Sequence, residues 1–62
     1  MKVKELIKKL ENDGWIFVRQ TGSHKHFKKS GIMHIITVPD HGVNEEVRKG
    51  LLHKIEKQAG WE

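Results

Sequence analysis

Two histidines that follow a tight turn are the part of this sequence best suited to chemistry. Gly22 allows the chain to reverse sharply, so strand pairing would hold His24 and His26 in fixed positions just after the turn. An unperturbed histidine has a pKa of about 6.5 and can therefore take or give a proton near neutral pH. We take His24 as the candidate working residue.

The charge of the chain indicates which kind of partner such a site would meet. The 62 residues include 12 Lys and Arg against 8 Asp and Glu, a formal net charge of +4, and the pI is about 9.6. A basic balance on a small body favours a polyanion such as nucleic acid, although solubility alone would also explain it. With two Trp, two Phe and no Tyr, recognition should depend on phosphates and shape rather than on stacked bases.

The length and the absence of cysteine limit the class of protein. A chain of 62 residues is too short for two cores, so we predict a single domain over residues 1–62. Without cysteine, neither disulfides nor a cysteine-based metal site can stabilise the fold, which suits a reducing compartment. No apolar run is long enough to span a membrane and no signal peptide opens the sequence, so we expect a soluble, cytoplasmic protein.

Two amphipathic helices flank the region of the histidines. Apolar residues at helical spacing predict a helix over residues 2–13, ended by Gly14. A second stripe predicts a helix over residues 45–59, with Asn44 as N-cap, an acidic first turn and Gly60 at its end. The inner stripe of this second helix consists of Val47, Leu51, Leu52, Ile55 and Ala59.

Between the helices, aromatic and β-branched residues predict three strands. They span residues 15–20, 24–28 and 32–38, and Pro39 ends the third because it cannot donate a ladder hydrogen bond. The order is therefore α-β-β-β-α, an α+β fold. We predict a three-stranded antiparallel sheet with both helices on one face, because two apolar stripes need one shared surface to bury. The opposite face of the sheet would be left partly open.

The turn between the first two strands decides which side chains reach that open face. A two-residue loop at 21–22 would place Arg19 opposite His24 and Ile16 opposite Phe27. A three-residue loop would instead turn both histidines toward the core, where imidazoles would displace apolar packing. The shorter loop sorts the side chains into two groups: Ile16, Val18 and Phe27 on one face, and Arg19, His24 and His26 on the other.

Several segments, in this order, resemble the HicA (YcfA-like) toxins of toxin-antitoxin systems. They are DGW at 13–15, RQTGSH at 19–24, Phe27, TVPDH at 37–41 and IEKQAG at 55–60. The resemblance covers essentially the whole chain and implies a fold like that of double-stranded-RNA-binding domains. It also implies an mRNA interferase, an endoribonuclease held inactive by a HicB antitoxin, whose catalytic histidine maps onto His24.

Cleavage of RNA in this way requires a base, an acid and positive charge, but no metal or other cofactor. The 2′-hydroxyl of RNA is the nucleophile, His24 would take its proton, and Arg19 could hold the phosphate. The acid that protonates the leaving 5′-oxygen would be His26 or Lys25, and the sequence does not decide between them. The predicted RNA contacts are Arg19, Lys25, His26, Lys28 and Lys29.

Other interpretations of the same residues stay open. The chain could be a double-stranded-RNA-binding module without catalysis, or chiefly a subunit whose open face is covered by an antitoxin. His24 and His26 could bind zinc with His34 or His41, since alternate strand residues share a face, but no carboxylate or cysteine stands at ligand spacing. His41 would otherwise order the loop after the third strand or line the path of the RNA.

Overall fold

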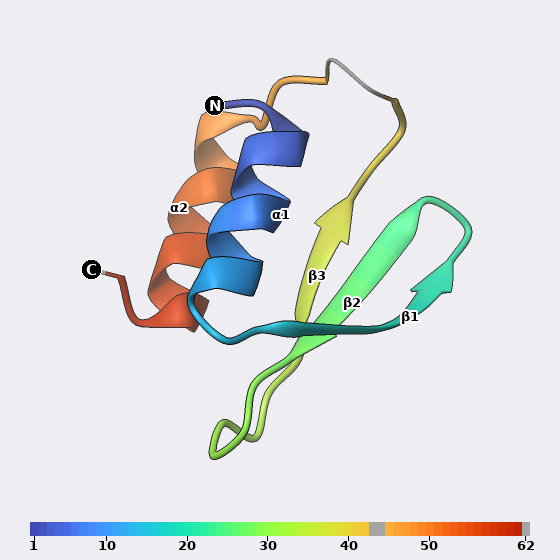
Figure 1. The fold of residues 1–62 in the computed structure, drawn as a ribbon. Helices are drawn as coiled ribbons and strands as arrows, with labels where there is room; N and C mark the ends of the chain where they lie inside the picture. Colours follow the sequence, from blue (N-terminus) through green and yellow to red (C-terminus); the bar gives the residue numbers. More distant parts are fainter. Residues whose placement is uncertain (43–44, 62) are drawn as a thin grey trace.

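The elements of the molecule follow the predicted order of helix, three strands and helix. The structure, a computed structural model, describes residues 1–42 and 45–61. Its elements are α1 (Val3–Asn12), β1 (Ile16–Thr21), β2 (His24–Lys28), β3 (Ile36–Pro39) and α2 (Lys49–Ala59). The strands form one antiparallel sheet in the order β1-β2-β3, and both helices lie on one face of it, as predicted (Figure 1). None of the described helices is long and apolar enough to cross a membrane.

The first helix, α1, is amphipathic as its sequence predicts. Val3, Leu6 and Leu10 recur at helical spacing and are buried, whereas the lysines between them are exposed. Gly14, at φ 98°, turns the chain out of the helix in a conformation that other residues rarely adopt. The next residue, Trp15, is buried in the core.

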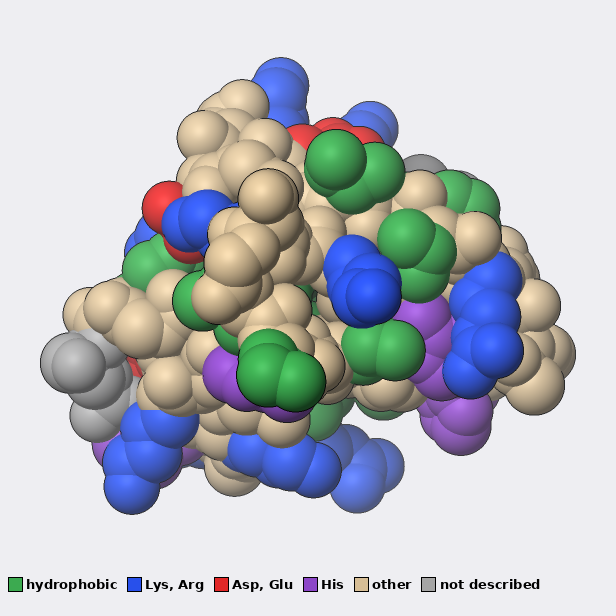
Figure 2. Space-filling view, turned by 90° about the horizontal axis from the view of Figure 1, so that it is seen from below, with side chains coloured by type: hydrophobic (Ala, Val, Ile, Leu, Met, Phe, Trp, Pro, Cys, Tyr) green, Lys and Arg blue, Asp and Glu red, His purple; other side chains and the backbone are tan. Residues whose placement is uncertain are grey.

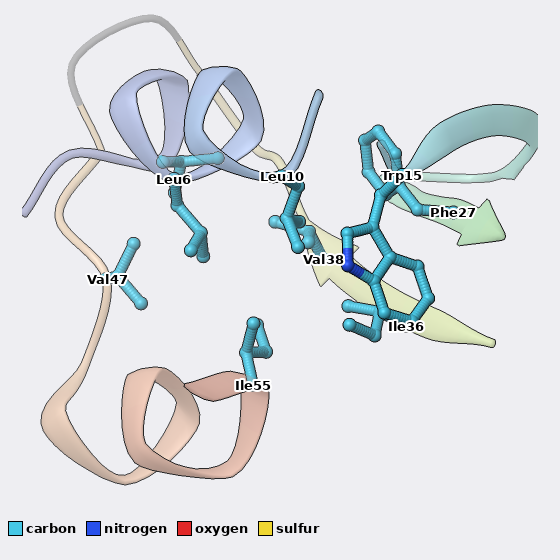
Figure 3. Packing of buried hydrophobic residues seen from close by; sticks show 9 residues of the cluster. Leu6, Leu10, Trp15, Phe27, Ile36, Val38, Val47 and Ile55 are labelled. Carbon is cyan, nitrogen blue, oxygen red and sulfur yellow. The ribbon is translucent and has the colours of Figure 1, made fainter. Parts of the chain in front are cut away.

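The core lies between the two helices and the covered face of the sheet. Figure 3 shows side chains entering it from both helices, from β2 and β3, and from the segment that precedes α2. A domain of this size buries only about 60% of the surface that its unfolded chain exposes, so each large core residue supplies a substantial share of the stability. The buried residues are Val3, Leu6, Leu10, Trp15, Phe27, Ile36, Val38, Val47 and Ile55.

The second helix, α2, begins at Lys49, four residues later than predicted. The residues before it are extended because they pair with the N-terminal segment. The Val3 N–H donates to the carbonyl O of Glu45 (2.8 Å), and the Val47 N–H donates to that of Met1 (2.8 Å). Val47 is buried as expected, but from this extended segment rather than from the helix. Apolar spacing alone did not separate the two cases.

The acidic pair predicted for the first turn of α2 therefore has another role. The Glu46 carboxylate forms ion pairs with the N-terminal ammonium group (3.2 Å to Oε2) and with Lys2 Nζ (3.4 Å to Oε1). The hydrogen bond and the charge of the ammonium group hold the pKa of the Glu46 carboxyl below its usual value. Arg48 is the N-cap of α2, and Asn44, the predicted N-cap, lies outside the described residues.

The third strand is shorter than the predicted 32–38. The preceding residues are held by other contacts: the Ile32 N–H donates to the carbonyl O of Lys29 (3.1 Å), and His34 Nε2 donates to that of Gln58 in α2 (2.7 Å). Within β3, alternate residues are buried, which identifies the covered face that the nearly continuous apolar run left undecided.

The turn between β1 and β2 lies one residue later than predicted, at 22–23. Thr21 pairs with His24, and Arg19 pairs with His26, so the predicted pairing of Arg19 with His24 is wrong. The partner of Arg19 has moved by two residues along β2, and a shift of two leaves every side chain on its original face. Arg19, His24 and His26 consequently share the open face, as predicted.

A β-bulge in β1, farther from the turn, does change which side chains lie on each face of the sheet. The register shifts by one residue between Phe17 and Arg19, and a shift of one turns the side chains beyond it to the other side of the sheet. Phe17 therefore pairs with Phe27, with ring centroids 6.0 Å apart, while Ile16 and Val18 are exposed. The predicted packing of Ile16 and Val18 with Phe27 is wrong.

Asp13 joins segments that are far apart in the sequence. Its Oδ2 accepts hydrogen bonds from Trp61 Nε1 (3.0 Å), Lys29 Nζ (3.2 Å) and Trp15 Nε1 (3.2 Å). The bonds from Trp61 and Lys29 hold the pKa of the Asp13 carboxyl below its usual value of 3.8, although partial desolvation raises it. The ionised carboxylate therefore stabilises the junction of α1, the turn after β2 and the C-terminal segment.

Replacing Asp13 by asparagine should lower the thermal unfolding midpoint at neutral pH and have less effect in acid. The folded-state pKa is depressed, so the stabilisation is fully present above pH 3.8 and is lost as the pH falls through the lower folded-state value. Tm measured from neutral to acid pH should therefore converge for wild type and Asp13→Asn. Glu11→Gln, which alters an exposed carboxyl of α1, is the matched control and should follow wild type. A difference in Tm that stays constant with pH would contradict this role.

Candidate active site

His24 is the first residue of β2, and its exposed side chain lies on the open face of the sheet. Thr21 of β1 and Pro39 of β3 pair with it on either side. The preceding turn is well defined: Gly22 takes φ 59°, and Gln20 Nε2 donates to the carbonyl O of Gly22 (2.8 Å). The backbone of His24 is therefore held at a fixed place while its ring stays open to solvent.

A hollow of about 380 Å³ adjoins His24 where the sheet meets the segment before α2. Its apolar lining consists of Val3, Pro39, Val47 and Leu51. His24 from β2, His41 from the loop after β3, and Arg48 from the N-cap of α2 also reach it. Glu45 and Glu46 also line it. The site thus combines two imidazoles, one guanidinium and two carboxylates.

The carboxylates of this hollow already have partners. Glu46 binds the N-terminal ammonium group and Lys2, and Glu45 Oε1 accepts the His41 N–H at 2.9 Å. Arg48 is exposed, and it is the one Lys or Arg residue among the described residues that line the hollow. The hollow can therefore receive an anion in spite of its mixed charges.

His26 shares the open face but offers less of its ring than His24. It is half-buried, and its Nδ1 lies 3.0 Å from Thr37 Oγ1 on β3. Its Nε2 is buried without a hydrogen-bond partner among the described residues. Both ring nitrogens of His26 are therefore less accessible to an approaching substrate than the exposed ring of His24.

Lys25 lies on the other face of the sheet. It pairs with the buried residue Val38, and its Nζ forms an ion pair with Asp40 Oδ2 at 2.7 Å. Its side chain lines a second hollow of about 680 Å³ between α1 and the hairpin, together with Lys4 and Lys8. The structure therefore separates Lys25 from the face that carries His24.

The remaining predicted contacts divide in the same way. Arg19 and Lys28 are exposed, and both pair on the open face, whereas Lys29 Nζ binds Asp13 Oδ2 at 3.2 Å. Figure 2 shows hydrophobic side chains interspersed with lysines and arginines on the side of the molecule seen from below, with histidines in separate places. This surface is mixed in character rather than uniformly basic.

The histidines considered for zinc do not form a metal site among the described residues. His34 donates to Gln58 of α2, and its ring lies 6.0 Å from that of Trp15. Among residues 1–42 and 45–61, no three His, Cys, Asp or Glu residues are placed to hold a metal ion together.

Arg48 was not predicted to be a site residue, and His41 was predicted either to order the loop after the third strand or to line the path of the RNA. Arg48 lies inside the helix predicted over residues 45–59, but the late start of α2 makes it the N-cap beside the hollow. A signal was present in the sequence, since His41 follows the strand-ending Pro39 and Asp40. What was missing is the pairing that brings this loop next to His24.

Comparisons with known proteins agree on one family. The sequence model described as HicA toxin of bacterial toxin-antitoxin matches residues 3–61. Among solved structures, a chain of the HicA3 and HicB3 toxin-antitoxin complex is 41% identical, with a TM-score of 0.76 over 97% of this chain and 94% of that chain. No curated protein gives a significant match. The similarity includes both helices and all three strands.

Proposed function

The chain belongs to the HicA toxin family, and we propose that it acts as an endoribonuclease with His24 as its catalytic base. Membership of the family makes it the toxin component of a toxin-antitoxin system, with a HicB-type antitoxin as its partner. RNA, the substrate of the proposal, suits the net charge of +4 and the presence of Arg48 in the lining of the hollow beside His24.

The observation that carries this proposal is the exposed imidazole of His24 beside a hollow that also contains Arg48. RNA brings its own nucleophile, the 2′-hydroxyl, so the protein has to move protons and stabilise charge on the phosphate. His24 would take the 2′-hydroxyl proton, and Arg48 would bind the phosphate oxygens on which negative charge builds up. None of these steps requires a metal ion.

Arg19 and Lys28 extend the proposed RNA surface along the open face. His26 lies between them and His24, and its bond to Thr37 suits a supporting role. We assign Lys25 and Lys29 a smaller contribution to RNA binding than their sequence positions suggested. Each is in an ion pair, with Asp40 and Asp13 respectively, so an RNA phosphate would have to compete with a carboxylate for it.

The antitoxin fits the same interpretation of the open face. A HicB-type chain that covered His24 would block the proposed catalysis and the approach of RNA in one contact. The hypothesis of a partner-binding subunit is therefore compatible with the nuclease, and a protein could satisfy both.

The proposal is tested by incubating the purified protein with end-labelled RNA in EDTA. We expect fragments, because the chemistry uses only side chains and the 2′-hydroxyl of the substrate. The same strand with 2′-deoxy sugars should bind but stay intact, because it lacks the nucleophile. Fragments should end in a 2′,3′-cyclic phosphate, which mass spectrometry identifies.

Binding without fragments would support the other candidate, a double-stranded-RNA-binding module without catalysis. In that case labelled RNA would shift in a gel and be recovered at full length. Cleavage of the 2′-deoxy strand would also contradict the proposal, because the bond would then be broken by a nucleophile other than the 2′-hydroxyl.

A further inference from the structure

Cleavage leaves negative charge on the 5′-oxygen, so the proposed reaction needs an acid as well as a base. The two acids suggested by the sequence are poorly placed. His26 has a buried Nε2 and an Nδ1 against Thr37, and Lys25 lies on the covered face in an ion pair with Asp40. The acid should therefore come from another element that reaches the hollow beside His24.

The loop after β3 brings a second imidazole to that hollow. His41 is exposed and lies between the two hollows, lining both the one beside His24 and the larger one beside Lys25. The Asp40 N–H donates to the carbonyl O of Ser23 (2.7 Å), and the His41 N–H donates to Glu45 Oε1 (2.9 Å). The residues immediately before the two histidines are thus hydrogen-bonded to each other, which fixes the two segments side by side.

The size and lining of this hollow suit the reacting part of an RNA strand. Its volume of about 380 Å³ is far larger than the space that a single water molecule needs. Arg48 lines the same hollow. A phosphate bound by Arg48 would therefore have an imidazole from β2 and another from the loop after β3 beside it.

We propose that His41 is the general acid of the reaction in which His24 is the base, an inference that rests on the proposed nuclease function. The 2′-oxygen forms a bond to phosphorus as its proton passes to His24. The bond from phosphorus to the 5′-oxygen breaks, and the protonated imidazole of His41 gives that oxygen its proton. The products are a 2′,3′-cyclic phosphate and a 5′-hydroxyl, and proton exchange with water restores both histidines.

A substrate with a better leaving group separates this role from a merely structural one. In RNA with sulfur in place of the 5′-bridging oxygen, the leaving group is a thiolate, whose conjugate acid has a pKa of about 8.5 and needs no proton to depart. His41→Ala should lose about 10²- to 10⁴-fold in rate on ordinary RNA. On the sulfur substrate it should cleave at close to the wild-type rate. His24→Ala should stay slow on both substrates, because each still needs a base.

The control variant is His53→Ala, which removes an exposed histidine of α2 outside the two hollows. It should match wild type on both substrates, and circular dichroism should show that all variants are folded. An equal loss for His41→Ala on the two substrates, or no loss on either, would overturn the assignment of His41 while leaving His24 in place. Wild-type protein that cleaves neither substrate would overturn the nuclease proposal and this inference together.

Discussion

His24→Ala is expected to lower the rate of RNA cleavage by about 10²- to 10⁴-fold, the range typical of a lost general base. The substitution removes the exposed imidazole from β2 but leaves the turn at Gly22 and the strand pairing in place. Because the side chain is exposed and contributes nothing to the buried core, the fold should persist. Cleavage of labelled RNA, growth of cells that express the variant, and circular dichroism should be measured together.

The growth measurement distinguishes catalysis from binding. A toxin that acts by cleavage should stop inhibiting growth when His24 is replaced, even though the variant still accumulates as folded protein. His53→Ala, on the exposed side of α2, should inhibit growth as wild type does. Undiminished cleavage or undiminished growth inhibition by His24→Ala would contradict the assignment of His24 as the base.

The same variant can test the contact with the antitoxin. If a HicB-type chain covers the open face through backbone and neighbouring side chains as well as His24, His24→Ala should still bind it. A pull-down with the antitoxin then provides a second check that the surface around the site is intact. Loss of both binding and cleavage would indicate a damaged surface rather than a missing base.

The face of the sheet on which the site residues lie could be predicted from the sequence. Side chains alternate between the two faces of a strand, so an error of two residues in the pairing leaves the predicted face correct. Arg19, His24 and His26 lie on the open face even though the turn was placed one residue too early, because the pairing is displaced by two residues there. The faces of Ile16 and Val18 were wrong because the bulge between Phe17 and Arg19 shifts the register by one. A bulge depends on pairing geometry that local residue types do not specify.

The start of α2 shows a second limit of sequence patterns. Val47 is apolar, buried and at helical spacing from Leu51, so it fits a helical stripe. It is nevertheless extended, because its N–H bonds to Met1 at the other end of the chain. Long-range pairing of this kind decided where the helix begins, and with it that Arg48 reaches the hollow beside His24.

Trp15→Ala is expected to unfold much of the protein population. Large-to-small substitution of a buried aromatic residue costs about 3–5 kcal/mol, and Trp15 is 1% exposed. At roughly 0.05–0.15 kcal/mol per residue, a domain of this length has a total stability of roughly 3–9 kcal/mol. The variant also removes the hydrogen bond that Trp15 Nε1 donates to Asp13 Oδ2 at 3.2 Å. Urea unfolding followed by far-ultraviolet circular dichroism should show a greatly reduced midpoint or no folded baseline.

The contrast between Trp15→Ala and His24→Ala links stability to function. Both should lose cleavage, but the first through loss of the fold and the second with the fold intact. Met33→Ala, at a side chain that is 97% exposed, is the apolar control and should change stability by less than about 0.5 kcal/mol. If Trp15→Ala unfolded at the same urea concentration as Met33→Ala, the indole could not be a main support of the core. The sheet that presents His24 would then depend on the remaining contacts of α1 and α2.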